Sequence, residues 1–172
     1  MTDAGMGRRC RGVALAILAM AATGLAVAPG GSAPAHAVED ARTALHQEVT
    51  IAAPPMRVYD ALLDSKSFAG FTGMPARIDR RAGGATWLFG GLVTGRNVEL
   101  VPGRRIVQAW RTVREWKPGV YSLVRFELQP RGSGTLLVLD QTGFPPGNFA
   151  HLDAGWPLRY WAPLKKFLAT HR

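Results

Sequence analysis

The stretch from Val98 to Trp116 constrains the fold of this chain more than any other part. It has the pattern of one strand, a turn at Pro102-Gly103, and a second strand that ends near Trp110. Similar runs separated by short glycine-rich turns precede and follow it, which is typical of an antiparallel meander and not of a parallel sheet with long crossovers. The strands expected from these turns span residues 76–80, 85–89, 92–101, 105–111, 120–129 and 135–142.

One further strand and two short helices are expected before the meander. Residues 45–51 alternate apolar and polar side chains with the period of two that marks a half-buried strand. Pro54-Pro55 then opens a helix over residues 56–64, since proline is tolerated in the first turn of a helix. We expect Ser65 to cap a second short helix that ends at Gly73.

A long amphipathic helix is expected at the end of the chain. From Asn148 to Thr170, large apolar residues recur every three or four positions. Pro157 and Pro163 fall inside this segment, and each proline costs about 3 kcal/mol in a regular helix interior because it removes a donor and clashes with the preceding turn. We therefore expect this helix to begin late, near Gly155, or to be broken, and to kink near Pro163.

Residues 1–37 have the pattern of a signal peptide. A basic segment at residues 8–11 precedes an uncharged, alanine-rich segment at residues 12–28, and Ala35 and Ala37 form an A-x-A cleavage site. We predict cleavage after Ala37 and export to the periplasm, the cell envelope or the exterior. The export route, general secretory or twin-arginine, stays open.

An uncleaved membrane anchor is the alternative for the same segment. A membrane span usually needs about 20 strongly apolar residues, and residues 12–28 are fewer and rich in alanine and glycine, which favours cleavage. Residues 38–43 are then a short tether and residues 44–172 form one domain.

Removal of residues 1–37 also removes the only cysteine of the chain, so neither a disulfide nor a cysteine metal site is expected. The remaining histidines, His46, His151 and His171, are too widely spaced for a metal site. No phosphate loop or dinucleotide fingerprint occurs, and we expect no cofactor. The expected mature chain keeps all 15 aromatic residues, a large supply for a core or a cavity.

The chain is basic, with 21 Lys and Arg against 12 Asp and Glu. Residues 1–37 hold three of the basic and one of the acidic residues, so the expected mature chain has a net charge of +7. This charge favours weak contact with anionic surfaces such as membranes. The basic residues are scattered, however, which indicates a solvated surface, and export argues against nucleic acid as a partner.

A known family shares many of these features. The shared motifs are Val58–Leu62, Gly95, Glu99–Pro102, Ile106-Val107, Trp110-Arg111, Trp116, Gly119–Ser122, Gly134-Thr135, Gly143–Pro145, Gly155-Trp156, Tyr160-Trp161 and Leu164-Lys165. On these motifs the chain, from about Val49 to Leu168, resembles the START-like (SRPBCC) superfamily. More narrowly, it resembles the C-terminal domain of activators of the heat-shock protein 90 ATPase and their bacterial single-domain relatives.

The resemblance implies an α+β helix-grip fold: a curved antiparallel sheet of about six or seven strands wrapped around a long C-terminal helix, with two short helices after the first strand. It also implies a cavity between the sheet and this helix. We select the side chains that face the cavity from strand alternation and helix periodicity: Phe68, Phe71, Trp87, Phe89, Val98, Leu100, Ile106, Gln108, Trp110, Ser122, Val124, Phe126, Leu137, Leu139, Gln141, Trp156, Tyr160 and Leu164.

A fully packed core is the alternative to a cavity at these positions. Among them, Gln108 and Gln141 are the candidates for orienting a polar atom of a ligand, because a buried amide needs a partner. Catalytic signals are weak. His151 and Asp153 lie two positions apart on a helix and do not share a face, and Glu99 with Arg111 is expected to form a cross-strand charge contact. We expect no catalytic residue.

Three functions are compatible with this pattern. The first, which we favour, is an exported START-like domain that binds a small hydrophobic or amphipathic ligand. The second is a co-chaperone-type interaction module related to the heat-shock ATPase activators, which the expected export argues against because that chaperone is cytoplasmic. The third is an enzyme similar to cyclases or aromatases, which requires an acid or base inside the cavity.

Overall fold

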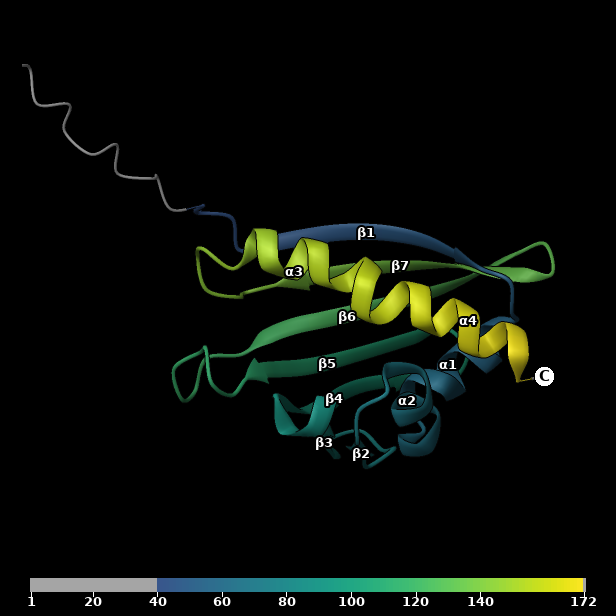
Figure 1. The fold of residues 1–172 in the computed structure, drawn as a ribbon, viewed down its shortest axis with the longest axis horizontal. Helices are drawn as coiled ribbons and strands as arrows, with labels where there is room; N and C mark the ends of the chain where they lie inside the picture. Colours follow the sequence, from purple (N-terminus) through teal and green to yellow (C-terminus); the bar gives the residue numbers. More distant parts are fainter. Residues whose placement is uncertain (1–39, 172) are drawn as a thin grey trace, which may run out of the picture. The chain divides into compact units, whose positions relative to one another are not determined.

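The computed structural model describes residues 40–171, so the expected signal peptide, including Ala35 and Ala37, and the start of the expected tether lie outside the described residues. Within them, a curved seven-stranded sheet carries the helices α1 to α4 over one face (Figure 1). The strands are β1 (Ala44–Ile51), β2 (Arg77–Ile78), β3 (Ala85–Leu88), β4 (Val93–Val101), β5 (Arg105–Thr112), β6 (Ser122–Arg131) and β7 (Gly134–Thr142). The helical segments are α1 (Pro55–Leu63), α2 (Ser65–Thr72), the 3₁₀ turn η1 (Phe89–Gly91), α3 (Phe149–Trp156), the π turn η2 (Pro157–Trp161) and α4 (Ala162–Thr170).

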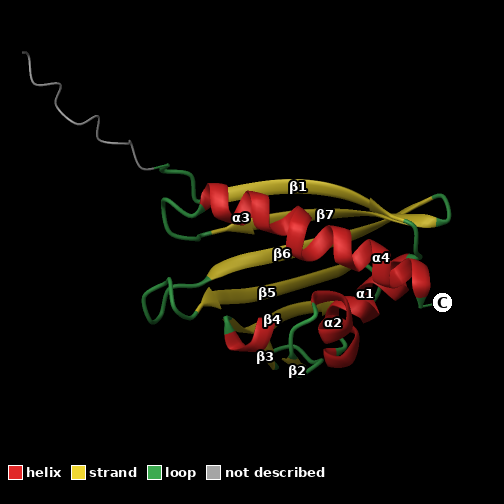
Figure 2. Ribbon diagram, in the orientation of Figure 1, coloured by secondary structure: helices red, strands yellow, loops and turns green. Residues whose placement is uncertain are grey.

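The sheet is antiparallel throughout, with the strand order β1-β7-β6-β5-β4-β3-β2 (Figure 2). Strands β2 to β7 form the predicted meander, and β1 pairs with β7, so that Leu45 lies opposite Gln141. The predicted fold is therefore confirmed. The glycines of the β3–β4 connection have φ of 66° and 91°, as expected for the Gly90-Gly91 turn. The first strand of the meander, expected over residues 76–80, is reduced to two residues, and β3 and β4 are each one residue shorter than predicted.

The second helix is capped by a different residue from the one expected. The Asp64 carboxylate accepts a hydrogen bond from the Ser67 amide at 2.7 Å, while the Ser65 hydroxyl accepts one from the Ile78 amide at 2.8 Å. The bond from Ser67 lowers the pKa of Asp64. The prediction that Ser65 caps α2 was wrong by one residue, and Ser65 instead ties β2 to this helix. Gly73 ends α2 with φ of 69°, as predicted.

The C-terminal helix begins at Phe149, so the expected late start near Gly155 was wrong. The helix accommodates its prolines by a π turn over Pro157–Trp161, which continues into α4, and this turn replaces the kink expected near Pro163. Pro157 has no amide to offer the carbonyl of Asp153. The side chain of Gln47 on β1 donates to that carbonyl at 2.8 Å and accepts a hydrogen bond from the Trp161 indole at 2.8 Å. The bond to Asp153 replaces the hydrogen bond that Pro157 cannot donate, and the two bonds together fix the C-terminal helix to β1.

Strand β4 contains a bulge between Asn97 and Glu99. The bulge places Asn97 in the core and leaves Val98 48% exposed, so the prediction that Val98 faces the cavity was wrong. The expected contact between Glu99 and Arg111 is not formed either. Glu99 accepts a hydrogen bond from Arg105 at 3.0 Å instead, because Glu99 pairs with Val107, two positions from Arg105, whereas Arg111 pairs with Thr94.

None of the helices within residues 40–171 combines the length and the apolar character that crossing a membrane requires.

Candidate functional site

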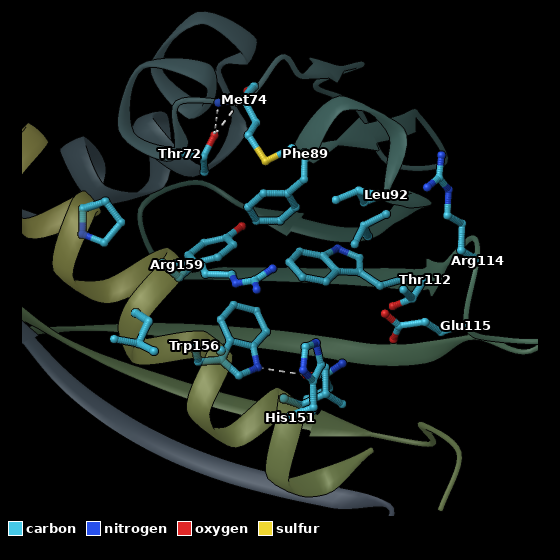
Figure 3. Close-up of a pocket in the computed structure, with 18 of the residues that line it drawn as sticks. Thr72, Met74, Phe89, Leu92, Thr112, Arg114, Glu115, His151, Trp156 and Arg159 are labelled. Carbon is cyan, nitrogen blue, oxygen red and sulfur yellow. Dashed lines mark hydrogen bonds between the residues drawn. The ribbon is translucent and has the colours of Figure 1, made fainter. Parts of the chain in front are cut away.

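A cavity of about 540 Å³ lies between the sheet and the C-terminal helix, bordered by the end of α2 and by η1 (Figure 3). It is partly open to solvent, and its volume falls within the range of about 300–1,000 Å³ that small-molecule sites occupy. Its apolar wall consists of Phe71, Met74, Phe89, Leu92, Val93, Trp110, Trp116, Leu152, Trp156, Leu158, Tyr160 and Pro163.

Aromatic rings that pack on one another form the back of this wall. Trp110 and Trp156 stack with ring centroids 5.3 Å apart, and the Tyr160 ring lies 4.7 Å from that of Trp156. Phe89, also in the wall, is the only residue other than glycine with positive φ, 52°, among the described residues. Its ring lies 5.9 Å from that of Tyr160. Because these rings fix one another, the wall is formed before any ligand arrives.

Six of the eighteen side chains predicted to face the cavity border it, namely Phe71, Phe89, Trp110, Gln141, Trp156 and Tyr160. They come from α2, η1, β5, β7 and the C-terminal helix. The fold thus brings together residues that are up to 89 positions apart in the chain.

The other predicted side chains do not border the cavity. Those buried in the packed core, with at most 2% of their surface exposed, are Phe68, Gln108, Val124, Phe126, Leu139 and Leu164. Leu100 packs against this core and is half-buried. Trp87 lies on the other face of β3, because Thr86 and Leu88 are the residues of this strand that face the core. Ile106, Ser122 and Leu137 are also core residues.

Gln108 has all its partners inside the protein. Its amide donates to Asn97 at 2.7 Å and its carbonyl accepts from the Trp110 indole at 2.9 Å. Asn97 in turn donates to the carbonyl of Asp79 at 2.8 Å. Gln108 therefore holds Trp110 and the β2–β3 connection in place and does not present a group to the cavity.

Gln141 makes an equivalent arrangement beside the cavity. It donates to the Ser122 hydroxyl at 2.9 Å and accepts from the Trp156 indole at 2.9 Å. The bond to Trp156 is the dashed line near the helix in Figure 3. Gln141 borders the cavity, but both ends of its amide are engaged, so its main effect is to orient the Trp156 ring.

The Tyr160 hydroxyl differs from these amides. Tyr160 is 3% exposed, and no described residue forms a hydrogen bond with its hydroxyl. The fully enclosed side-chain atoms without a partner among the described residues are Oγ1 of Thr86 and Nε of Arg111. The Tyr160 oxygen is not one of them, and Tyr160 borders the cavity. Burial raises the pKa of Tyr160 well above its ordinary value, so the hydroxyl remains a donor at neutral pH.

Charged side chains stand at the mouth of the cavity. They are Arg114, Glu115 and Arg159, with His151 beside them. Figure 3 shows the Arg159 side chain extending across the cavity between Phe89 and Trp156. Neither arginine forms a salt bridge with a carboxylate among residues 40–171.

His151 and Asp153 do not form an acid–base pair. His151 borders the cavity, whereas the Asp153 carboxylate accepts a hydrogen bond from Gln47 at 2.7 Å on the side of β1. Within residues 40–171, no group of three or more His, Cys, Asp or Glu side chains is placed to hold a metal ion.

The sequence interpretation missed the residues of the mouth. Leu158 and Arg159 border the cavity together with Tyr160, because the π turn brings three consecutive residues to one side. Regular helical periodicity selects only Trp156 and Tyr160. Met74 and Leu92 were missed because they follow turns, where alternation gives no direction.

The sheet that grips a C-terminal helix, with a cavity between them, defines a START-like domain of the helix-grip fold. Residues 52–169 match the family "Activator of Hsp90 ATPase homolog 1-like protein", and the chain belongs to this family.

A protein of Dictyostelium discoideum named "Activator of 90 kDa heat shock protein ATPase homolog" is 34% identical over 103 residues, which cover 59% of this chain and 27% of that protein. The chain spans between 27% and 36% of the length of the curated relatives that it matches.

Two solved structures illustrate the shared fold. An HSP90 activator from Plasmodium falciparum superposes with a TM-score of 0.70 at 23% identity, over 74% of this chain and 97% of that one. A protein from Chromobacterium violaceum superposes with a TM-score of 0.58 at 29% identity, over 72% of this chain and 95% of that one.

Proposed function

We propose that this chain is an exported START-like protein that binds a small hydrophobic or amphipathic molecule in the cavity between its sheet and its C-terminal helix. The observation that carries the proposal is the cavity of about 540 Å³, walled by Phe89, Trp110, Trp156 and Tyr160. Export is the expectation from residues 1–37 alone.

The polar groups around the cavity support a binding role. The amides that hold the wall are internally satisfied, as Gln141 is by Ser122 and Trp156. Because these amides need no water as a partner, little is lost when the apolar part of a ligand displaces the water beside them. The exposed Leu158, 75% accessible, extends the apolar surface to the mouth.

A variant that fills the cavity tests the proposal. Gly155 borders the cavity on α3, and a Cβ added there meets no heavy atom within 4 Å. We expect Gly155→Met to place its side chain in this space and to reduce ligand capture at least tenfold. The fold should be retained, because replacing a glycine inside a helix favours the helix by up to about 1 kcal/mol.

Two measurements are made on the protein as isolated from its host. Organic extraction with mass spectrometry detects a co-purifying molecule. Titration with decanol, monitored by tryptophan fluorescence, gives the affinity of the protein for decanol. Ala154→Leu is the matched control, because Ala154 is exposed, lies on the same helix and does not border the cavity. Equal capture by wild type and Gly155→Met would contradict the proposal.

A second candidate function is supported by family membership. The Dictyostelium discoideum relative is named as an activator of the 90 kDa heat-shock protein ATPase, and a related interaction with a chaperone is the alternative for this chain. The mature N-terminus and cellular location discriminate the two proposals. Cytosolic protein that retains residues 1–37 and stimulates the chaperone ATPase would favour the second, whereas cleavage after Ala37 and export would favour the first.

A further inference from the structure

We infer that the molecule bound in this cavity is an amphipathic carboxylate, whose apolar body packs against the tryptophan wall and whose acidic group lies beside Arg159 at the mouth and accepts a hydrogen bond from the Tyr160 hydroxyl. This inference rests on the proposed function and specifies its ligand class. It is carried by the hydroxyl of Tyr160, a residue that borders the cavity, and by the charges at the mouth.

The Tyr160 hydroxyl requires an acceptor. Tyr160 is 3% exposed, and its hydroxyl has no hydrogen-bond partner among residues 40–171. A buried hydroxyl without a partner costs free energy, whereas the neighbouring indoles of Trp110 and Trp156 each have a glutamine acceptor. The position is therefore built for a ligand that carries oxygen, since a pure hydrocarbon would leave this donor unsatisfied.

The charges at the mouth favour an anion. The charged residues bordering the cavity are Arg114, Arg159 and Glu115, an excess of one positive charge. The carboxylate of Asp153 points elsewhere, because Gln47 donates to it. Arg159 extends across the cavity in Figure 3, and no described carboxylate lies within salt-bridge distance of it. A planar guanidinium binds a carboxylate through two parallel hydrogen bonds.

The π turn explains why one molecule meets both features. It brings Leu158, Arg159 and Tyr160, three consecutive residues, to the cavity. A single chain segment thus offers an apolar contact, a cation and a neutral donor. π turns of this kind are frequent at functional sites.

The test compares three probes with the same ten-carbon chain: decanoate, decanol and decyltrimethylammonium. Affinities for the full isolated protein are measured by calorimetry at pH 7.5 after extraction of any co-purifying molecule. We expect decanoate to bind about five- to tenfold more tightly than decanol, because a partly exposed guanidinium contributes modestly, and the cation to bind most weakly.

Two variants assign the preference to residues. Arg159→Gln should abolish the preference for decanoate over decanol. Tyr160→Phe should weaken decanoate and decanol alike, by about threefold to tenfold. Arg131→Gln is the matched control for net charge, because Arg131 is exposed at the end of β6 and does not border the cavity.

The outcomes separate this inference from the proposed function. If decanol and the cation bind as tightly as decanoate, or if Arg159→Gln keeps the preference, the inference is overturned while the binding function stands. If none of the three probes binds up to its solubility limit, the proposed function is overturned together with the inference.

Discussion

The interface between the sheet and the C-terminal helix has two regions with the same kinds of apolar side chain. In the closed region these side chains form a packed core, and in the open region they line a cavity. In the closed region, Phe68, Phe126 and Leu164 are at most 1% exposed and do not border the cavity. In the open region, Trp110 and Tyr160 border a cavity of about 540 Å³. The closed region also receives α1, which contacts β6, β7 and α4.

The difference shows that covering elements, and not residue type, decide which part of this sheet is hollow. The short helices lie over one end of the sheet, while the open region has only η1, the end of α2 and the loop after β5 around it (Figure 1). The rings of Phe126 and Tyr160 stack with centroids 6.1 Å apart, so the two regions share a border. The closed region therefore supports the aromatic wall of the cavity from one side, while the other side of this wall faces the cavity.

The largest effect should come from truncation in the closed region. We expect Phe126→Ala to lower the free energy of unfolding by about 3–5 kcal/mol, as for buried phenylalanines in general. Phe89→Ala, in the half-buried wall of the open region, should lower it by about half as much, since less of its surface is buried. Urea denaturation of both variants measures the difference, and equal losses would break the distinction between the regions.

The two glutamines sharpen the same comparison. Gln108→Met leaves the Trp110 indole and the Asn97 carbonyl without partners in a sealed core, so we expect a loss of about 2–3 kcal/mol. Gln141→Met strips Trp156 and Ser122 of a partner. Gln141 is equally buried but borders the cavity, so we expect water from the cavity to replace the lost partner and limit the loss to about 1 kcal/mol. Urea denaturation measures both losses. A larger loss for Gln141→Met would mean that its side of the cavity is dry.

Alternation along the sequence predicted the faces of the long strands but not the difference between the regions. Trp110, Phe126 and Leu139 point to the interior as expected, because β5, β6 and β7 are regular. Trp87 does not, because β3 is a four-residue strand beside turns, and Val98 does not because a bulge interrupts β4.

The cavity and the hydrogen bonds that hold its wall could not be predicted from the sequence and were found only in the structure. Whether an inward residue meets packing atoms or open space depends on elements far away in the chain, as for Phe71 and Gln141. The contact of Gln47 with Asp153 joins residues 106 positions apart. A glutamine in a strand carries no signal that a proline in a distant helix has freed a carbonyl.

At the mouth, an exposed side chain should separate binding from stability. Leu158 is 75% exposed, so Leu158→Ser should change the free energy of unfolding by no more than about 0.5 kcal/mol. It should weaken decanol binding about threefold, because the apolar margin of the open region is reduced. Leu123→Ser, which is 49% exposed on β6 and does not border the cavity, is the control. Equal decanol affinity in both variants would remove Leu158 from the site.

The smallest effect is expected at the sheet edge, outside both regions. His46 on β1 lies 2.8 Å from the carboxylate of Asp140 on β7, and this bond raises the pKa of His46, with a smaller contribution from Glu48 at 3.8 Å. Because the folded state binds the proton more tightly than the unfolded state, the stabilisation is complete below the ordinary histidine pKa of about 6.5. It is lost as the pH rises through the raised pKa.

The pair is exposed and screened by solvent, so His46→Gln should lose no more than about 0.5 kcal/mol. Urea denaturation should detect this loss at pH 5.5 and not at pH 8.5, and a loss that grows with pH would show that the bond does not depend on the protonated ring.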